Sequence, residues 1–189
     1  MIRRAAFAVV AIALVTAACS SNEPPPQPPP TPTQTTTQAP VTDTSAEDAR
    51  RAAEEAARAA EAERTRLRAV IEEVVLFDYD ASRIRTDAEA ALQRKVPVLR
   101  SNPGVRLRIS GHADERGSVE YNLALGLRRA NSVRDYLVNF GIDASRITTE
   151  TFGEDRPVDS GMTEAAYQRN RRAEFTITSG GENLVSPGG

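Results

Sequence analysis

Two residues of opposite charge, Asp114 and Arg129, are the first candidates for chemistry in this chain of 189 residues. They belong to one stretch, GHADERGSVEYNLALGLRRANSVRDYL (residues 111–137), in which Arg129 follows Asp114 by 15 positions. A carboxylate accepts hydrogen bonds from an ammonium group, and a guanidinium donates two parallel hydrogen bonds to a carboxylate. If the fold brings the two side chains together, they suit a zwitterion such as the free end of an amino acid.

The surrounding pattern predicts which elements hold this pair. Residues 105–110 alternate between apolar and polar side chains, which is typical of a strand with one face on the core. Residues 118–139 carry apolar side chains at helical spacing, and Gly141 follows as the expected end signal. We therefore expect Asp114 in the loop that leaves a strand and Arg129 about three turns into the next helix.

The same reasoning predicts a single domain over residues 74–179. Its other expected parts are strands over 74–80, 147–152 and 172–177, a helix over 87–100 that Pro97 kinks or shortens, a loop over 153–167 and, beyond the domain, a loose tail over 180–189. This β-α-β-α-β-β order predicts an α/β fold, a two-layer sandwich in which two helices cover one face of a mixed sheet.

Three segments of different composition precede this domain. Residues 1–18 have a basic start, a short apolar run and small residues at the end, which is typical of a secretory signal peptide and too short for a membrane-spanning helix. Residues 19–45 contain most of the 12 prolines and almost nothing apolar, so they are predicted to be an unfolded linker. Residues 46–73 are rich in Ala, Glu and Arg, and predict a solvated single helix or a weak coiled coil, whose last turn can dock on the domain.

Composition excludes several classes of function. The 24 basic and 26 acidic residues nearly balance, which argues against nucleic-acid binding. Cys19 is the only cysteine and His112 the only histidine, so neither an internal disulfide nor a Cys/His metal site is expected. Asp114, Glu115 and Glu120 could supply the two carboxylates of a glycosidase, but no nucleophile motif accompanies them. We therefore expect a binding protein rather than an enzyme.

Residues 74–178 resemble the OmpA-like domain family, and the motifs GHADERG, EYN and LRRAN carry the resemblance. In that family, the Asp of the GH-x-D motif and the Arg of an R-A pair at this spacing hold the diaminopimelate group of peptidoglycan peptide stems. The resemblance implies this role for Asp114 and Arg129. Diaminopimelate carries an ammonium and a carboxylate at its free end, so it fits the zwitterion chemistry inferred from the residues.

The resemblance implies further peptidoglycan-binding residues, namely Phe77, Asp78, Tyr121, Asn122 and Arg171. The residues themselves leave alternatives open. Asp78 can pair with a structural arginine, Asn122 can tie down the Asp114 loop, and Arg171 can form a structural salt bridge. Ser110, His112 and Asp114 alternate along the strand, and this spacing is too long for the direct hydrogen bonds of a catalytic triad. His112 is therefore expected to orient the Asp114 loop instead.

The resemblance also implies a location and a protein partner. Cys19 follows small residues as in a bacterial lipobox, although Thr16 stands where that motif usually has Leu. The lipobox resemblance implies that Cys19 carries acyl chains, which anchor the protein in the outer membrane, facing the periplasm. A TolB-like periplasmic protein is the expected partner, with Glu115 and Arg116 as exposed candidates for its contacts, in a system acting in envelope integrity and cell division. No cofactor is expected, and a scaffold that binds only protein remains the alternative.

Overall fold

The computed structural model describes residues 44–188. The predicted signal peptide, Cys19 and nearly all of the predicted linker lie outside the described residues. The described elements, in order, are α1 (Thr44–Glu72), β1 (Val75–Leu76), α2 (Thr86–Ser101), β2 (Arg106–His112), α3 (Val119–Asn139), a 3-10 turn (Ala144–Arg146), β3 (Ile147–Gly153), α4 (Glu164–Asn170) and β4 (Arg172–Ser179). Within residues 44–188, no helix combines the length and the apolar character that crossing a bilayer requires.

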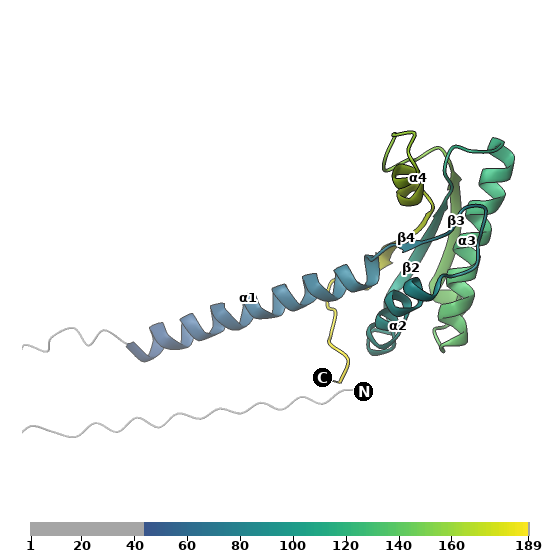
Figure 1. The fold of residues 1–189 in the computed structure, drawn as a ribbon. Coiled ribbons are helices and arrows are strands. Elements are labelled where there is room, and N and C mark those ends of the chain that lie inside the picture. The colour runs from purple at the N-terminus through teal and green to yellow at the C-terminus, as the bar shows by residue number, and fades with distance from the viewer. Residues whose placement is uncertain (1–43, 189) are drawn as a thin grey trace, which may run out of the picture. The chain divides into compact units, whose positions relative to one another are not determined.

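The four strands form one mixed sheet in the order β1-β4-β2-β3. β2 and β3 are parallel, whereas β4 runs antiparallel to both β2 and β1. The predicted mixed α/β fold is therefore confirmed. This topology brings the ends of β1, β2 and β3 and the start of β4 to the same end of the sheet, so the loops that carry the candidate site residues meet there (Figure 1).

Two predicted elements differ from the structure. The first strand was expected over residues 74–80, but only Val75–Leu76 pair with β4, because the chain then leaves the sheet toward α2. Residues 153–167 were expected to be loop, yet α4 begins at Glu164 after a cap in which the Thr163 hydroxyl accepts a hydrogen bond from the amide of Ala166. With Ala166 as its one buried apolar residue, this short helix lacks the apolar period that sequence analysis depends on.

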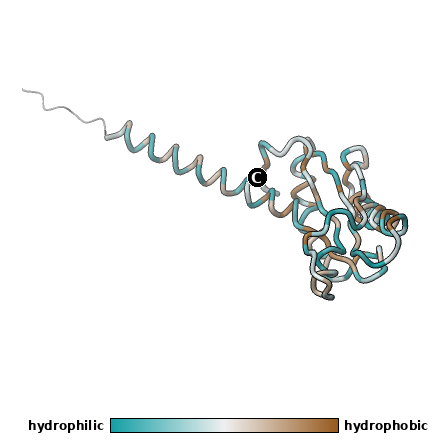
Figure 2. The backbone as a smooth tube through the Cα atoms, turned by 90° about the horizontal axis from the view of Figure 1, so that it is seen from above, coloured by the Kyte–Doolittle hydropathy of each residue, from teal (hydrophilic) through white to brown (hydrophobic). Residues whose placement is uncertain are grey.

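The core lies between one face of the sheet and the helices α2 and α3. Leu107 and Ile109 of β2 point into it, while the alternating Arg106 and Arg108 are exposed, as the pattern predicted. Figure 2 shows apolar residues gathered in the domain, while α1 is largely hydrophilic. The helix α2 continues through Pro97 to Ser101, so the proline does not shorten it.

A close glycine contact sets the position of α3 on the sheet. A Cβ atom added to Gly111 of β2 would lie 1.8 Å from the carbonyl oxygen of Gly126, and one added to Gly126 would lie 2.4 Å from the Thr151 hydroxyl. Because neither glycine has a side chain, α3 can approach β2 this closely. Since Arg129 follows Gly126 by nearly one turn, this contact brings the arginine under the end of β2.

The last turn of α1 docks on the domain, as predicted. Leu67 and Ile71 are buried members of the hydrophobic core. The ammonium of the fully buried Lys95 donates to the carbonyls of Val70 at 2.8 Å, Ile71 at 3.1 Å and Glu73 at 2.6 Å. Lys95 thus supplies donors to carbonyls that the end of a helix leaves unpaired.

The tail after β4 packs against the domain instead of remaining loose. Leu184 is buried in the core. The Asn102 side chain donates to the carbonyl of Val185 at 2.9 Å and accepts from its amide at 2.9 Å, and the Ser186 hydroxyl donates to Glu63 of α1 at 2.7 Å. The predicted loose tail is therefore wrong for the described residues 180–188, since composition alone did not show these distant partners.

Candidate functional site

A small pocket of about 110 Å³ opens where the loops after β1 and β2 meet the start of α3. Its lining residues are Tyr79, Asp80, Asp114, Arg116, Gly117, Tyr121, Asn122, Leu125 and Arg129. The fold therefore brings Asp114 and Arg129 to one cavity. Tyr121 and Asn122 line it as well, whereas the predicted site residues Phe77, Asp78 and Arg171 do not.

Arg129 is the fully buried cation of this pocket. Its guanidinium donates to the carbonyls of Ala81 at 2.8 Å, His112 at 2.7 Å and Asp78 at 3.0 Å. Burial lowers the pKa of Arg129 to about 10, although the nearby Asp114 carboxylate opposes this shift, so the group stays charged at neutral pH. A guanidinium has five N–H donors. Three of them are held in a fixed orientation by carbonyls, and two make no hydrogen bond with the described residues.

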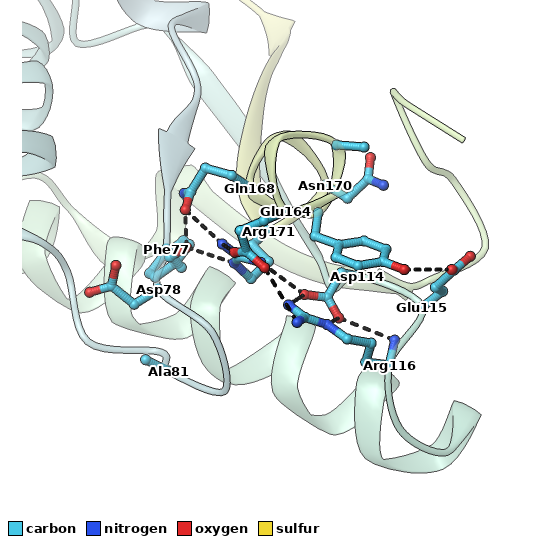
Figure 3. Close-up of polar contacts among 12 residues, drawn as sticks. Phe77, Asp78, Ala81, Asp114, Glu115, Arg116, Glu164, Gln168, Asn170 and Arg171 are labelled. Carbon is cyan, nitrogen blue, oxygen red and sulfur yellow. Dashed lines mark hydrogen bonds and ion pairs between the residues drawn. The ribbon is translucent and has the colours of Figure 1, made fainter. Parts of the chain in front are cut away.

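Asp114 is the buried anion of the same pocket, and arginines surround it (Figure 3). One carboxylate oxygen accepts from the amide and Nε of Arg116 at 3.1 and 3.2 Å. The other accepts from Arg116 Nη2 at 2.7 Å and Arg171 Nη1 at 3.1 Å. Burial alone would raise the pKa of Asp114, but the hydrogen bonds from Arg116 and Arg171 outweigh it and hold the pKa below its ordinary value. Asp114 is thus ionised at neutral pH.

Arg171 supports Asp114 from behind the pocket. Besides Asp114, its guanidinium contacts Glu164 at 2.7 Å, the Gln168 side chain at 2.6 Å and the carbonyl of Phe77 at 3.2 Å. These partners leave it nearly inaccessible to solvent. Of the two roles considered for Arg171, the structural salt bridge is the one observed.

Phe77 and Asp78 contribute their main chain to the site. The Phe77 ring is fully buried in the core, and its carbonyl accepts from Arg171 and from Gln168. The Asp78 carbonyl accepts from Arg129, while its carboxylate pairs with Arg85 at 2.8 Å, outside the pocket. Phe77 and the Asp78 carboxylate therefore do not line this pocket, and the pairing of Asp78 with an arginine is the alternative observed.

Tyr121 and Asn122 begin α3 and have different roles. The buried Asn122 amide donates to the carbonyls of Asp114 at 3.1 Å and Arg116 at 3.4 Å, so it ties down the loop. The half-exposed Tyr121 donates its hydroxyl to Asp80, and this bond raises the pKa of Tyr121. Asn122 thus fits the loop-tying alternative, and Tyr121 forms part of the pocket wall.

His112 positions Arg129 through its main chain only. Its ring is buried beside Phe152, and both ring nitrogens lack a hydrogen-bond partner among residues 44–188. Burial, assisted by Arg172, lowers the pKa of His112 to about 4, so the ring is neutral at ordinary pH. The described residues contain no group of three His, Cys, Asp or Glu side chains that could hold a metal ion.

Sequence reasoning missed Arg116, Tyr79 and Asp80 as pocket residues. Arg116 was expected at an exposed loop tip, but its guanidinium folds back onto Asp114 and stacks over the ring of Tyr79 at 4.1 Å. The signal was present in the DERG sequence, where an arginine two positions after an aspartate can close a short hydrogen-bonded turn. The contact with Tyr79, which is distant in sequence, has no such local signal.

Comparisons with known proteins agree with this geometry. A family model described as "OmpA family" matches residues 76–171. The chain is 43% identical over 107 residues to a peptidoglycan-associated lipoprotein of Rhizobium meliloti, covering 57% of this chain and 61% of that protein. It is 42% identical over 111 residues to one of Mesorhizobium japonicum, covering 59% and 66%. The chain therefore matches less than two thirds of the length of these relatives.

Solved structures are similar over the same region. The crystal structure of the peptidoglycan-associated lipoprotein from Burkholderia pseudomallei has a TM-score of 0.53 and 38% identity, covering 55% of this chain and 87% of that one. The C-terminal domain of Helicobacter pylori MotB has the same TM-score at 17% identity, covering 57% and 84%, which supports the fold alone. Because the family model covers just over half of the sequence, including Asp114 and Arg129, this chain belongs to the OmpA family.

Proposed function

We propose that this chain is a non-catalytic envelope protein that binds peptidoglycan through the diaminopimelate of its peptide stems. The observation that carries the proposal is the shared pocket of Asp114 and Arg129, two buried and oppositely charged groups. Relatives named peptidoglycan-associated lipoprotein, at 43 and 42% identity, support the same ligand.

The mode of binding follows from the two charged groups of a zwitterionic ligand, each of which meets a residue of opposite charge. The ligand carboxylate takes the two N–H groups of Arg129 that the chain leaves available, and the ligand ammonium pairs with Asp114. Three carbonyls orient the guanidinium beforehand, so little conformational freedom is lost when a stem binds. Affinity for one stem can be modest, because the cell wall presents many stems to a protein held at a membrane.

The remainder of the chain is proposed to act as a tether. Acyl chains on Cys19 hold the outer membrane, the proline-rich segment extends from it, and α1 carries the connection into the core of the binding domain. A TolB-like periplasmic protein is the proposed protein partner, in a Tol–Pal type of system that supports envelope integrity and cell division. The resemblance of the GHADERG-to-LRRAN region supports this assignment.

The test is co-sedimentation of residues 44–189 with purified peptidoglycan sacculi. The fragment begins at α1, because Leu67 and Ile71 of that helix belong to the core. Asp114→Ala removes the ammonium partner and should weaken binding by more than tenfold, since the loss of one buried charge contact costs about 2–5 kcal/mol. Asp114→Asn is measured as well, because it retains acceptors for Arg171 if the alanine variant is unstable.

Asp135→Asn is the matched control, since Asp135 lies exposed on α3 and pairs only with Arg134 at 2.8 Å among the described residues. Equal binding by wild type and both Asp114 variants would remove this pocket from the mechanism. Absence of binding by the wild type would favour a protein-only scaffold. Chromatography of the supernatant tests for soluble muropeptides, whose release would instead support a glycosidase.

A further inference from the structure

The Arg116 side chain occupies the place on Asp114 that a ligand ammonium needs. Its Nε and Nη2 donate to the two oxygens of the Asp114 carboxylate, one at 3.2 Å and the other at 2.7 Å (Figure 3). This is the side-by-side geometry in which arginine binds carboxylates most strongly. Arg116 lines the same pocket as Asp114 and Arg129, so its guanidinium occupies Asp114 at the proposed ligand site.

The surroundings of Arg116 form a receptor for a cation. The guanidinium lies over the Tyr79 ring at 4.1 Å and over the Tyr167 ring at 4.4 Å. Glu164 adds a second carboxylate, 3.4 Å from Nη1. Two aromatic faces and two carboxylates are also what an organic ammonium ion favours. We name this set, Tyr79, Asp114, Glu164 and Tyr167, the cation cage.

Asp114 has no acceptor position left while Arg116 is in the cage. A carboxylate offers about four lone-pair sites, and four donors of the described chain use them: the Arg116 amide, Nε and Nη2, and Arg171 Nη1. A ligand ammonium therefore reaches Asp114 only if one of these donors leaves. The Arg171 side chain is 3% exposed and has three further partners, whereas that of Arg116 is 33% exposed, so Arg116 is the one that can move.

Movement of Arg116 does not require the loop to unfold. The Asn122 amide holds the carbonyls of Asp114 and Arg116, and the Arg116 amide keeps its own bond to Asp114. Only the side chain has to swing toward solvent. The cage and the loop backbone stay in place, ready for a different cation.

We propose that Arg116 is an internal substitute for the ligand ammonium, which the ligand must displace, and that it thereby makes the pocket selective for zwitterions. A simple amine only replaces the Arg116 guanidinium with another cation in the cage, so its net binding free energy is small. A ligand that also brings a carboxylate to Arg129 gains contacts that Arg116 cannot make. This inference rests on the proposed function and adds to it the residue that determines ligand class.

The test compares the full-length chain in detergent micelles with its Arg116→Met variant, using a stem peptide that ends in diaminopimelate and 1,5-diaminopentane, which lacks carboxylates. If the cage of the wild type is open for about a tenth of the time, removal of Arg116 should tighten peptide binding by about tenfold. The variant should also gain measurable affinity for 1,5-diaminopentane, which the wild type should lack. Arg116→Gln tests the same loss with a polar side chain, and Arg134→Met, on the exposed face of α3, is the matched control.

Each outcome of this test decides the proposal. Unchanged or weaker peptide binding by both Arg116 variants, with a wild type that binds, would overturn the displacement mechanism and leave the proposed function intact. A wild type and variants that all fail to bind the peptide would overturn both. Carbon NMR of the Asp114 carboxyl is an independent check, because loss of Arg116 should raise the pKa of Asp114. An unchanged pKa would contradict the ion pair on which the inference rests.

Discussion

Lys95 and Arg129 are both fully buried cations, and each donates hydrogen bonds to three main-chain carbonyls, yet their surroundings differ. Lys95 belongs to α2, and its ammonium reaches the C-terminal end of α1, 4.4 Å from the centre of the Phe175 ring. Arg129 lines the pocket beside Asp114. An ammonium has three donors and a guanidinium has five, so Lys95 uses all its donors within the chain and Arg129 keeps two.

This comparison shows that burial of a charge does not by itself indicate a binding site. Both sites stabilise a cation with carbonyls, and burial lowers both pKa values, to about 8 for Lys95 and about 10 for Arg129. The two cations differ in that Arg129 keeps donors without a partner among the described residues and lines a pocket, whereas Lys95 caps the end of a helix. Lys95 accordingly couples α1 to the domain, while the proposed function assigns the remaining donors of Arg129 to a ligand.

The largest effect is expected when Arg129 is given the same number of donors as Lys95. Arg129→Lys keeps the charge but can satisfy the three carbonyls only by using every donor, so binding to sacculi should weaken by more than tenfold, or about 2–5 kcal/mol. Co-sedimentation measures the loss, and Arg134→Lys on the same helix serves as the control. Retained affinity would mean that the remaining guanidinium donors do not contact the ligand.

The second prediction concerns stability, and it applies to Lys95. Between about pH 8 and pH 10.5 the unfolded chain keeps a proton on Lys95 that the folded chain has released, so the free energy of unfolding should increase with pH there. A shift of this size corresponds to about 3 kcal/mol. Urea unfolding at several pH values measures it. Lys95→Met should abolish the increase and leave binding to sacculi unchanged; an increase of the same size in Lys95→Met would assign it to another group.

The smallest expected effect comes from the carboxylate near Lys95. Glu73 raises the pKa of Lys95, although burial is the larger influence and acts in the opposite direction. Glu73 is itself exposed in part and pairs with Arg94 at 2.8 Å. Glu73→Gln should lower the pKa of Lys95 slightly and cost less than about 1 kcal/mol of stability. Nitrogen NMR of the Lys95 ammonium follows the shift, and a higher pKa in the variant would contradict this account.

Local pattern predicted most of the fold. Three elements depend on interactions between residues close in sequence, so their existence and type could be predicted. They are β2 with its alternation, α3 with its apolar period, and the charged, Ala-rich α1. The expected helix 87–100 agrees with α2 to within one residue at each end. Helix α4 and the packing of Leu184 were not predicted, because a seven-residue helix and a tail with one buried leucine carry no period.

The candidate pair could be predicted from the sequence, because Asp114 and Arg129 stand in a motif whose strand, loop and helix follow from local preferences. Tertiary structure alone decided the partners of each charge. Arg171 pairs with Asp114 across 57 positions, and Asp78 offers Arg129 its carbonyl while its carboxylate turns to Arg85. It also decided that Lys95 is buried and that Arg116 fills the cation cage. Such contacts depend on distance in space between segments remote in sequence, which the period of a local pattern does not encode.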